Sequence, residues 1–356
     1  MSPSRSREGL GEGLSSSVTS PPPTPPAGGR GVFEKALRQR LRTEGKLSVE
    51  AYMEACNAYY YATRDPLGSA GDFTTAPEIS QMYGELIGAA LADAWARAGR
   101  PESVRFAELG PGRGTLASDA LRVMRAAGCH PASVELVETS PRLRKLQAAN
   151  LPGAIFHDDI AALGNGNGPL LIVASEFFDA LPIRQFVGQA ERHVLLSGGA
   201  LAFDRDGEIR ETSPARDNVA AALASVLAKC GGVALVIDYG HDRADATGDT
   251  LQAVRGHRFA LPLDAPGEQD LTAHVDFAAL AAAAAGVTAS RVISQGSWLE
   301  TLGIAQRAIA LAAANPEQTQ TIADARRRLC AEKEMGSLFK VMVLASPTWP
   351  TIAGLE

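Results

Sequence analysis

Short apolar runs alternate with amphipathic stretches along most of the chain from about residue 104 onward. Each apolar run ends in a polar or glycine-rich segment, whereas the stretches between the runs have the residue spacing of helices. This alternation predicts parallel βαβ units and therefore an α/β fold with a doubly wound sheet. The predicted strands cover 104–109, 134–137, 154–157, 170–174, 233–237, 287–293 and 339–345, with helices at 115–127 and from Ser140-Pro141 onward.

The segments outside this alternation predict the organisation of the chain. Helical patterns at 32–42, 49–57 and 79–98 indicate a helical N-terminal segment that covers 32–100. The core is expected at 101–350, with insertions at about 184–212 and 245–280. Alternation of apolar and polar residues predicts a β-hairpin or meander in the first insertion, and the second is expected to be irregular.

Residues 1–31 have a different composition, rich in Ser, Gly and Pro and almost without large apolar side chains. Such a segment cannot bury a core, so we expect a disordered tail. The net charge of -6 and the pI near 5.6 argue against general binding to nucleic acids or anionic membranes. No apolar run is long enough to span a bilayer. The four cysteines show no CxxC spacing, which disfavours zinc and redox sites and fits a reducing compartment.

The most informative segment is the loop Glu108-Leu109-Gly110-Pro111-Gly112-Arg113-Gly114, between a predicted strand and a predicted helix. A dinucleotide fingerprint would need Gly or Ala where Thr115 stands, and a phosphate-binding Walker loop would need a lysine. Acid-x-Gly-x-Gly-x-Gly is instead typical of enzymes that use S-adenosylmethionine. We therefore expect Glu108, Gly110, Gly112 and Gly114 to bind that cofactor.

Acidic residues also follow the next two predicted strands. Glu138 is placed to accept hydrogen bonds from both ribose hydroxyls of a nucleoside, as acids at this position do in dinucleotide sites. Asp158 or Asp159 would accept the adenine amino group. Each acid alone is equally well explained as a solvated loop residue. Three acids at successive strand ends, with the glycine loop at the first, favour the cofactor interpretation.

Several strings together resemble the MidA-like methyltransferases, the family that includes the mitochondrial complex I assembly methyltransferase. They occur in order at 71–80, 108–116, 137–141, 176–182, 238–241, 270–277 and 335–341. The resemblance implies a class I methyltransferase (Rossmann-like) sheet with an antiparallel last strand. It also implies methylation of arginine on a protein substrate, a respiratory complex I subunit in mitochondrial members. One position departs from the family, which usually has Asn where Ser175 stands.

Glu176 and Asp179 are the candidate catalytic residues. A protonated guanidinium is a poor nucleophile, and a pair of carboxylates would bind it and direct one nitrogen toward the methyl group. The alternative is that both acids cap a following helix. Asp72, Phe73 and Thr75 would form a substrate or cofactor lid, although an ordinary connecting loop is the simpler reading without the resemblance. Asp238 and His241 are expected in the same cleft, and the His and Asp spacings fit no common metal site.

Three functions remain open from the residues alone. The main hypothesis is a protein-arginine methyltransferase, and the alternatives are a Rossmann oxidoreductase and a non-catalytic assembly factor; methylation of RNA or a small molecule is a further variant. The expected partner is a protein, with no nucleic acid and no membrane, and a homodimer is left open. The expected compartment is the bacterial cytoplasm, with the mitochondrial matrix as the alternative.

Overall fold

The structure is a computed structural model, and it describes residues 31–64, 68, 71–244 and 246–356. The predicted disordered tail therefore lies outside the described residues except for Gly31.

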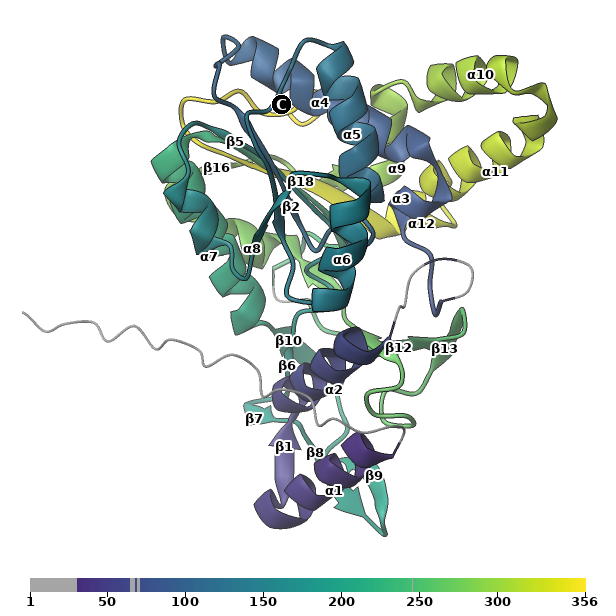
Figure 1. Cartoon of the computed structure of the whole chain (residues 1–356). Helices are drawn as coiled ribbons and strands as arrows, with labels where there is room; N and C mark the ends of the chain where they lie inside the picture. The colour runs from purple at the N-terminus through teal and green to yellow at the C-terminus, as the bar shows by residue number, and fades with distance from the viewer. Residues whose placement is uncertain (1–30, 65–67, 69–70, 245) are drawn as a thin grey trace, which may run out of the picture.

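The centre of the fold is a nine-stranded, mostly parallel sheet (Figure 1). Its main path runs β16-β18-β11-β5-β2-β3-β4, and the strands from β11 to β4 are all parallel to their neighbours. β18 is antiparallel to β11, which confirms the expected class I methyltransferase sheet. The strands are β2 (Arg105–Leu109), β3 (Val134–Val137), β4 (Ile155–His157), β5 (Leu170–Ser175), β11 (Gly232–His241), β15 (Val275–Asp276), β16 (Thr288–Ala289), β17 (Ile293–Ser294) and β18 (Phe339–Ala345).

Helices cover both faces of this sheet, which explains why its strands are mostly apolar rather than alternating between apolar and polar residues. Neighbouring residues of one strand enter opposite cores: Phe106 packs with α4 and α5, whereas Ala107 packs with α7. The two helical layers lie on opposite sides of the sheet in Figure 1. The helices around the sheet are α3 (Ala76–Ile79), α4 (Gln81–Arg97), α5 (Thr115–Ala126), α6 (Pro141–Asn150), η1 (Ala161–Asn165), α7 (Pro214–Cys230), α8 (Phe277–Ala283), α9 (Gln295–Thr301), α10 (Ile304–Ala314), η2 (Pro316–Gln318), α11 (Thr319–Cys330) and α12 (Met335–Leu338).

Two of these helices, α4 and α5, approach each other at Gly88. A Cβ added at Gly88 would lie 2.4 Å from the Ala120 carbonyl oxygen and 2.7 Å from the Ala120 Cα. We therefore expect Gly88→Ala to force the helices apart and to lower the free energy of unfolding by about 1–3 kcal/mol. Urea denaturation measures this, with Ala89→Val at the neighbouring exposed position as the control. Equal stability of the two variants would contradict the close approach.

A second unit lies beside the sheet, at the bottom of Figure 1. It is built from α1 (Val32–Glu44), β1 (Lys46–Ser48) and α2 (Val49–Thr63), together with strands from both insertions. Their apolar residues share one core that includes Leu37, Tyr52, Met53 and Leu271. The strands are β6 (Arg184–Val187), β7 (Ala190–Glu191), β8 (His193–Ser197), β9 (Ala200–Phe203), β10 (Ile209–Thr212), β12 (Gln252–Arg255), β13 (Arg258–Ala260) and β14 (Asp270–Thr272).

The insertions are more ordered than the sequence pattern predicts. The first is not a single hairpin but contributes to two three-stranded sheets, β1-β8-β9 and β10-β6-β7. The second contains a third sheet, β13-β12-β14, where an irregular segment was expected. The predicted strand at 287–293 is instead two short strands that both pair with β18. In the described part of the chain, none of the helices has the length and apolar character to cross a membrane.

Candidate active site

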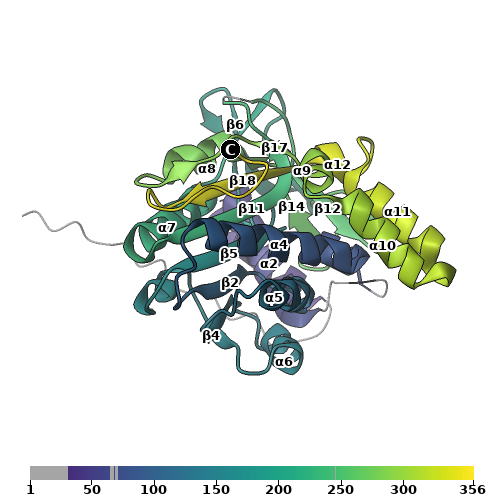
Figure 2. The same ribbon diagram turned by 90° about the horizontal axis from the view of Figure 1, so that it is seen from above.

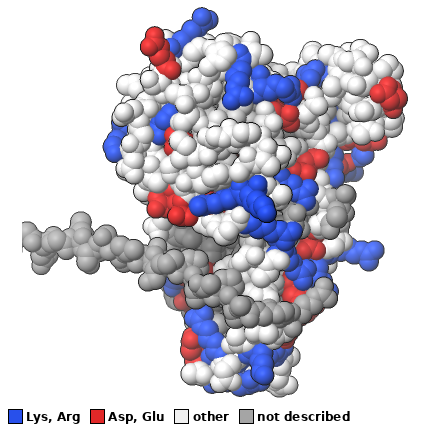
Figure 3. Space-filling model, viewed as in Figure 1, with Lys and Arg blue, Asp and Glu red and all other residues white. Residues whose placement is uncertain are grey.

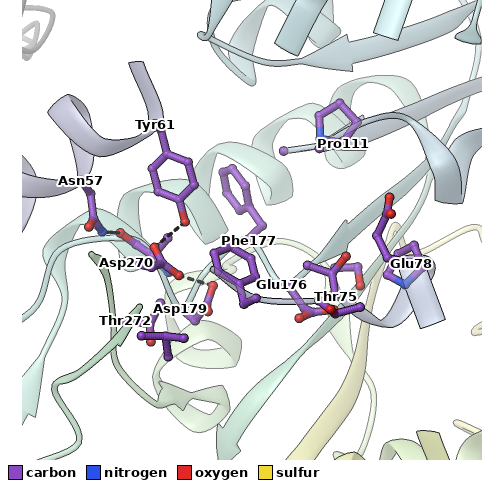
Figure 4. A pocket seen from close by; sticks show the side chains of 18 of the residues that line it. Asn57, Tyr61, Thr75, Glu78, Pro111, Glu176, Phe177, Asp179, Asp270 and Thr272 are labelled. Carbon is purple, nitrogen blue, oxygen red and sulfur yellow. Dashed lines mark hydrogen bonds between the residues drawn. The ribbon is translucent and has the colours of Figure 1, made fainter. Parts of the chain in front are cut away.

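A pocket of about 810 Å³ opens where the carboxyl ends of β2, β3 and β5 meet the second unit. In open α/β sheets this edge is where ligands bind. Figure 2, which views the molecule from above, shows α5 beside β2 and the α10–α11 hairpin projecting to one side. Figure 4 shows the pocket from close by, with Pro111 on one side and Asp179 and Asp270 on another.

The glycine loop forms one wall of the pocket. Gly110, Gly112 and Gly114 have φ values of 58°, 54° and 79°, a conformation that L side chains rarely adopt. A Cβ at Gly110 would lie 2.9 Å from Cδ2 of Phe177. Gly110 and Gly112 line the pocket, whereas Gly114 sits at the N-cap of α5 and turns the chain into that helix.

Glu108 lies at the end of β2 beneath this loop and lines the pocket with only 4% of its surface exposed. Its Oε2 atom is buried and has no hydrogen-bond partner. Burial raises the pKa of Glu108 to about 8, because the backbone N–H of Ala117 offsets only part of the desolvation. A buried oxygen of this kind is costly unless a donor supplied by a ligand meets it.

Glu138 follows β3 and also lines the pocket. Its Oε1 accepts from the Ser140 N–H at 2.8 Å, and its Oε2 accepts from Nε2 of Gln147 at 3.2 Å. Desolvation raises the pKa of this carboxyl despite both hydrogen bonds. Because each carboxylate oxygen has two lone pairs, Glu138 retains the capacity to accept from a ligand.

Asp158 and Asp159 do not line the pocket. The Asp158 side chain is 84% exposed and pairs with the Arg144 guanidinium at 2.7 Å. Asp159 accepts from the Ala162 N–H at 3.0 Å, at the start of η1. The adenine contact assigned to one of them stays a prediction, without support from the pocket lining.

Glu176 and Asp179 both line the pocket, on the loop that follows β5. Glu176 has a φ of +53°, which is unusual for a residue other than glycine. Its Oε1 accepts from the Ala76 N–H at 2.7 Å, at the start of α3. Burial and, to a smaller extent, repulsion from the neighbouring Asp179 raise its pKa to about 8, although the hydrogen bond from the Ala76 N–H opposes the shift. The loop leads into β6 rather than a helix, so neither acid caps a following helix, although Glu176 contacts the start of the preceding helix α3.

Asp238 and His241 are near the pocket but do not line it. Asp238 is fully buried and accepts from the backbone N–H groups of Phe178 and Asp179, at 2.9 and 3.2 Å. Its carboxyl thus holds the loop that carries Asp179. His241 has a buried Nδ1 atom without a hydrogen-bond partner. In the described part of the chain, no group of His, Cys, Asp or Glu residues is arranged to hold a metal ion.

Only some residues of the expected lid segment lie at the pocket. Phe73 and Thr75 line the pocket, and Asp72 does not. Asp72 accepts from the Tyr60 hydroxyl and from the Gly256 N–H, both at 2.7 Å. It therefore joins this segment to the β12–β13 hairpin at the mouth of the pocket.

Sequence reasoning missed several residues that line the pocket from the second unit. They include Asn57, Tyr61, Gln252, Phe259, Asp270 and Thr272. Phe259 is 81% exposed, which is unusual for a large aromatic side chain and places it at the rim. Asp270 is the first residue of the 270–277 string, which contributes to the resemblance to the family. The sequence has no periodic pattern there that predicts a strand.

Comparison with known proteins identifies the family. A family model described as "Putative S-adenosyl-L-methionine-dependent methyltransferase" matches residues 86–199 and 193–294, more than half of the chain. The chain belongs to this family. The cofactor of the family is S-adenosyl-L-methionine, which excludes the Rossmann oxidoreductase alternative and confirms the cofactor expected from the glycine loop.

Two relatives and one solved structure show how far the similarity extends. The mitochondrial protein arginine methyltransferase NDUFAF7 homolog of Drosophila melanogaster is 33% identical over 89% of this chain and 85% of its own length. The Homo sapiens protein arginine methyltransferase NDUFAF7 is 33% identical, over 86% of this chain and 82% of its own length. A Burkholderia thailandensis protein bound to S-adenosyl-homocysteine has a TM-score of 0.78 at 26% identity, covering 90% of this chain and 93% of its own.

Proposed function

We propose that this methyltransferase acts on arginine side chains of a protein substrate. The observation that carries the proposal is the position of Glu176 and Asp179, two carboxylates that line the same pocket as the glycine loop. A guanidinium carries five N–H donors and a fixed positive charge, so paired carboxylates suit it better than they suit a neutral acceptor. The relatives named as protein arginine methyltransferases support the same acceptor.

The residues at the strand ends fit the cofactor. When bound, S-adenosylmethionine supplies an electrophilic methyl group on a sulfonium centre. Glu108, with its unpartnered Oε2, would face the cationic part of the cofactor. Glu138 would accept from the ribose hydroxyls, and Gly110 and Gly112 would let the backbone approach the ligand closely.

Ser175 bears on how the acceptor loop is held, the loop after β5 that carries Glu176 and Asp179. It ends β5 directly before Glu176, and its Oγ lies 2.9 Å from the Tyr83 hydroxyl. The serine thus keeps one hydrogen bond to α4 at a position where the family usually has an amide. This contact supports an intact acceptor loop despite the departure from the family pattern.

The distribution of charge supports a protein rather than a nucleic acid as substrate. On the face in Figure 3, acidic and basic side chains are interspersed, and Lys and Arg occur at the top, around the middle and at the bottom without forming one continuous basic surface. A nucleic-acid backbone would favour a continuous basic surface. A respiratory complex I subunit is the substrate suggested by the family resemblance, in the mitochondrial matrix or, for a bacterial protein, in the cytoplasm.

The experiment uses S-adenosylmethionine with a labelled methyl group and a lysate of source cells that lack this protein. We expect label in one main protein band, and acid hydrolysis of that band should release labelled methylarginine. The Glu176→Gln protein serves as the control for other methyltransferases in the lysate. Label in another amino acid, in RNA or in small molecules would contradict the arginine assignment. Cofactor binding without any transfer would favour a non-catalytic assembly factor.

A further inference from the structure

A third carboxylate reaches the acceptor end of the pocket from outside the methyltransferase sheet. Asp270 lies on β14, in the three-stranded sheet of the second insertion. Asp270 and Thr272 line the pocket, whereas Leu271 between them packs into the core of the second unit. Successive side chains of a strand point to opposite faces, so one face of β14 borders the pocket and the other packs into the core. In Figure 4, Asp270 lies between Tyr61 and Asp179.

The Asp270 side chain is held in place by α2. The Tyr61 hydroxyl donates to its Oδ1 at 2.7 Å. One turn earlier on α2, Asn57 donates to the Leu271 carbonyl at 2.7 Å and to the Ala180 carbonyl at 2.9 Å. Asn57 therefore joins β14 to the loop that carries Asp179, so the two carboxylates are fixed relative to each other.

A buried guanidinium strengthens the same connection from the other side. Arg216 donates to the carbonyls of Phe178 and Asp179, and also to those of Ala273 and His274. The Ala273 N–H donates to the Asp179 carbonyl at 3.1 Å. Because the donors of Arg216 go to backbone carbonyls, its side chain organises the two segments and forms no direct ion pair with either carboxylate.

A cationic ligand would stabilise the buried carboxylates of Asp270 and Asp179. Asp270 is 4% exposed, and no cationic side chain in the described part of the chain forms an ion pair with it. Burial and repulsion from Asp179 together raise the pKa of Asp270 to about 8. Buried carboxylates next to each other are unfavourable without a partner, and an asparagine at position 270 would fill the same space without that cost.

We propose that Asp270 contacts the acceptor guanidinium directly, as a third carboxylate beside Glu176 and Asp179, and that Tyr61 positions it. The inference rests on the proposed function, since it assigns the same acceptor. It adds that the second insertion supplies part of the acceptor site. Specificity for a guanidinium thus depends on a segment outside the central sheet.

The test measures binding of N-acetyl-arginine amide to the full-length protein saturated with S-adenosyl-homocysteine. N-acetyl-citrulline amide, of the same shape but neutral, is the control ligand. We expect Asp270→Asn to weaken binding of the arginine compound by about tenfold or more, as expected for loss of a charge-assisted hydrogen bond. Asp264→Asn, an exposed change of the same kind in the same insertion, should bind like wild type. Melting temperature and S-adenosyl-homocysteine affinity check that each variant is folded.

The pH dependence distinguishes positioning by Tyr61 from a merely structural role. A carboxyl with a raised pKa is neutral at low pH, so affinity for the arginine compound should rise as the pH passes through about 8. Tyr61→Phe removes a hydrogen bond that stabilises the charged form of Asp270, so the midpoint should move to higher pH. Asp270→Asn should reduce this rise in affinity and leave the part that Glu176 contributes, since the pKa of Glu176 is also raised to about 8.

The outcomes separate this inference from the function on which it rests. Unchanged affinity and an unchanged pH profile in Asp270→Asn, with wild type still preferring the arginine compound, would overturn the role of Asp270 alone. Equal binding of the arginine and citrulline compounds by wild type would overturn both proposals. Should Asp270→Asn fail to fold, Tyr61→Phe decides: an unmoved pH midpoint would overturn the proposal.

Discussion

Replacing Gly112 with valine should weaken S-adenosyl-homocysteine binding by about a hundredfold or more, a loss of roughly 3 kcal/mol. Gly112 has a φ of +54° and lines the pocket beside Glu108 and Glu138. A β-branched residue is strained in this conformation by about 1–2 kcal/mol, and its side chain would occupy space at the ligand surface. Isothermal titration calorimetry measures the affinity directly.

A matched variant separates strain from loss of the binding surface. Gly198, at the β8–β9 turn, has a φ of +58° with nothing within 4 Å of an added Cβ, and it does not line the pocket. Gly198→Val should therefore lose similar stability and keep full cofactor affinity. If both variants bind S-adenosyl-homocysteine like wild type, Gly112 does not form the cofactor surface.

The central sheet could be predicted because local signals in the sequence agree with one another there. The strand predicted at 134–137 is β3 without a change of bounds, and Ser140 caps α6 by accepting from the Leu143 N–H. Buried parallel strands are apolar on both faces, and each is followed by residues that must turn. The glycine loop and Glu108 follow from the same logic, since a strand end and a helix start fix where they lie.

The second unit could not be predicted in the same way. Its strands are short, and β12, β13 and β14 are stabilised by packing against α1 and α2, which are far away in the sequence. Without the prediction of β14, nothing placed Asp270 opposite Asp179. Sequence pattern also left out α7, whose first turn carries Arg216 toward the acceptor loop.

The strand-end argument has a limit that Asp158 and Asp159 illustrate. Both follow β4 as predicted, but the end of a strand fixes only the backbone position of the next residues. Arg144 pairs with Asp158, and the Asp159 carboxylate accepts a hydrogen bond from the Ala162 N–H in the first turn of η1. The direction of a side chain thus depends on neighbours that the strand pattern does not specify.

Replacing Glu176 with glutamine should lower the rate of methyl transfer by about a hundredfold or more, the loss expected when ~3 kcal/mol of transition-state stabilisation disappears. Glutamine keeps an oxygen that can accept from the Ala76 N–H, so the link to α3 is preserved while the negative charge is removed. Cofactor affinity should change little, because the proposed contact is with the acceptor. Single-turnover rates with labelled cofactor measure the effect.

A purely structural role for Glu176 predicts the opposite pattern. If its carboxylate only holds the start of α3, Glu176→Gln should be nearly silent. Glu176→Ala, which leaves the Ala76 N–H without this acceptor, should then lower the melting temperature while the folded fraction transfers methyl groups at a normal rate. In the proposed role, both variants lose turnover to a similar degree, and only the alanine variant also loses stability. Normal turnover in Glu176→Gln would remove Glu176 from the chemistry and leave Asp179 and Asp270 to bind the acceptor.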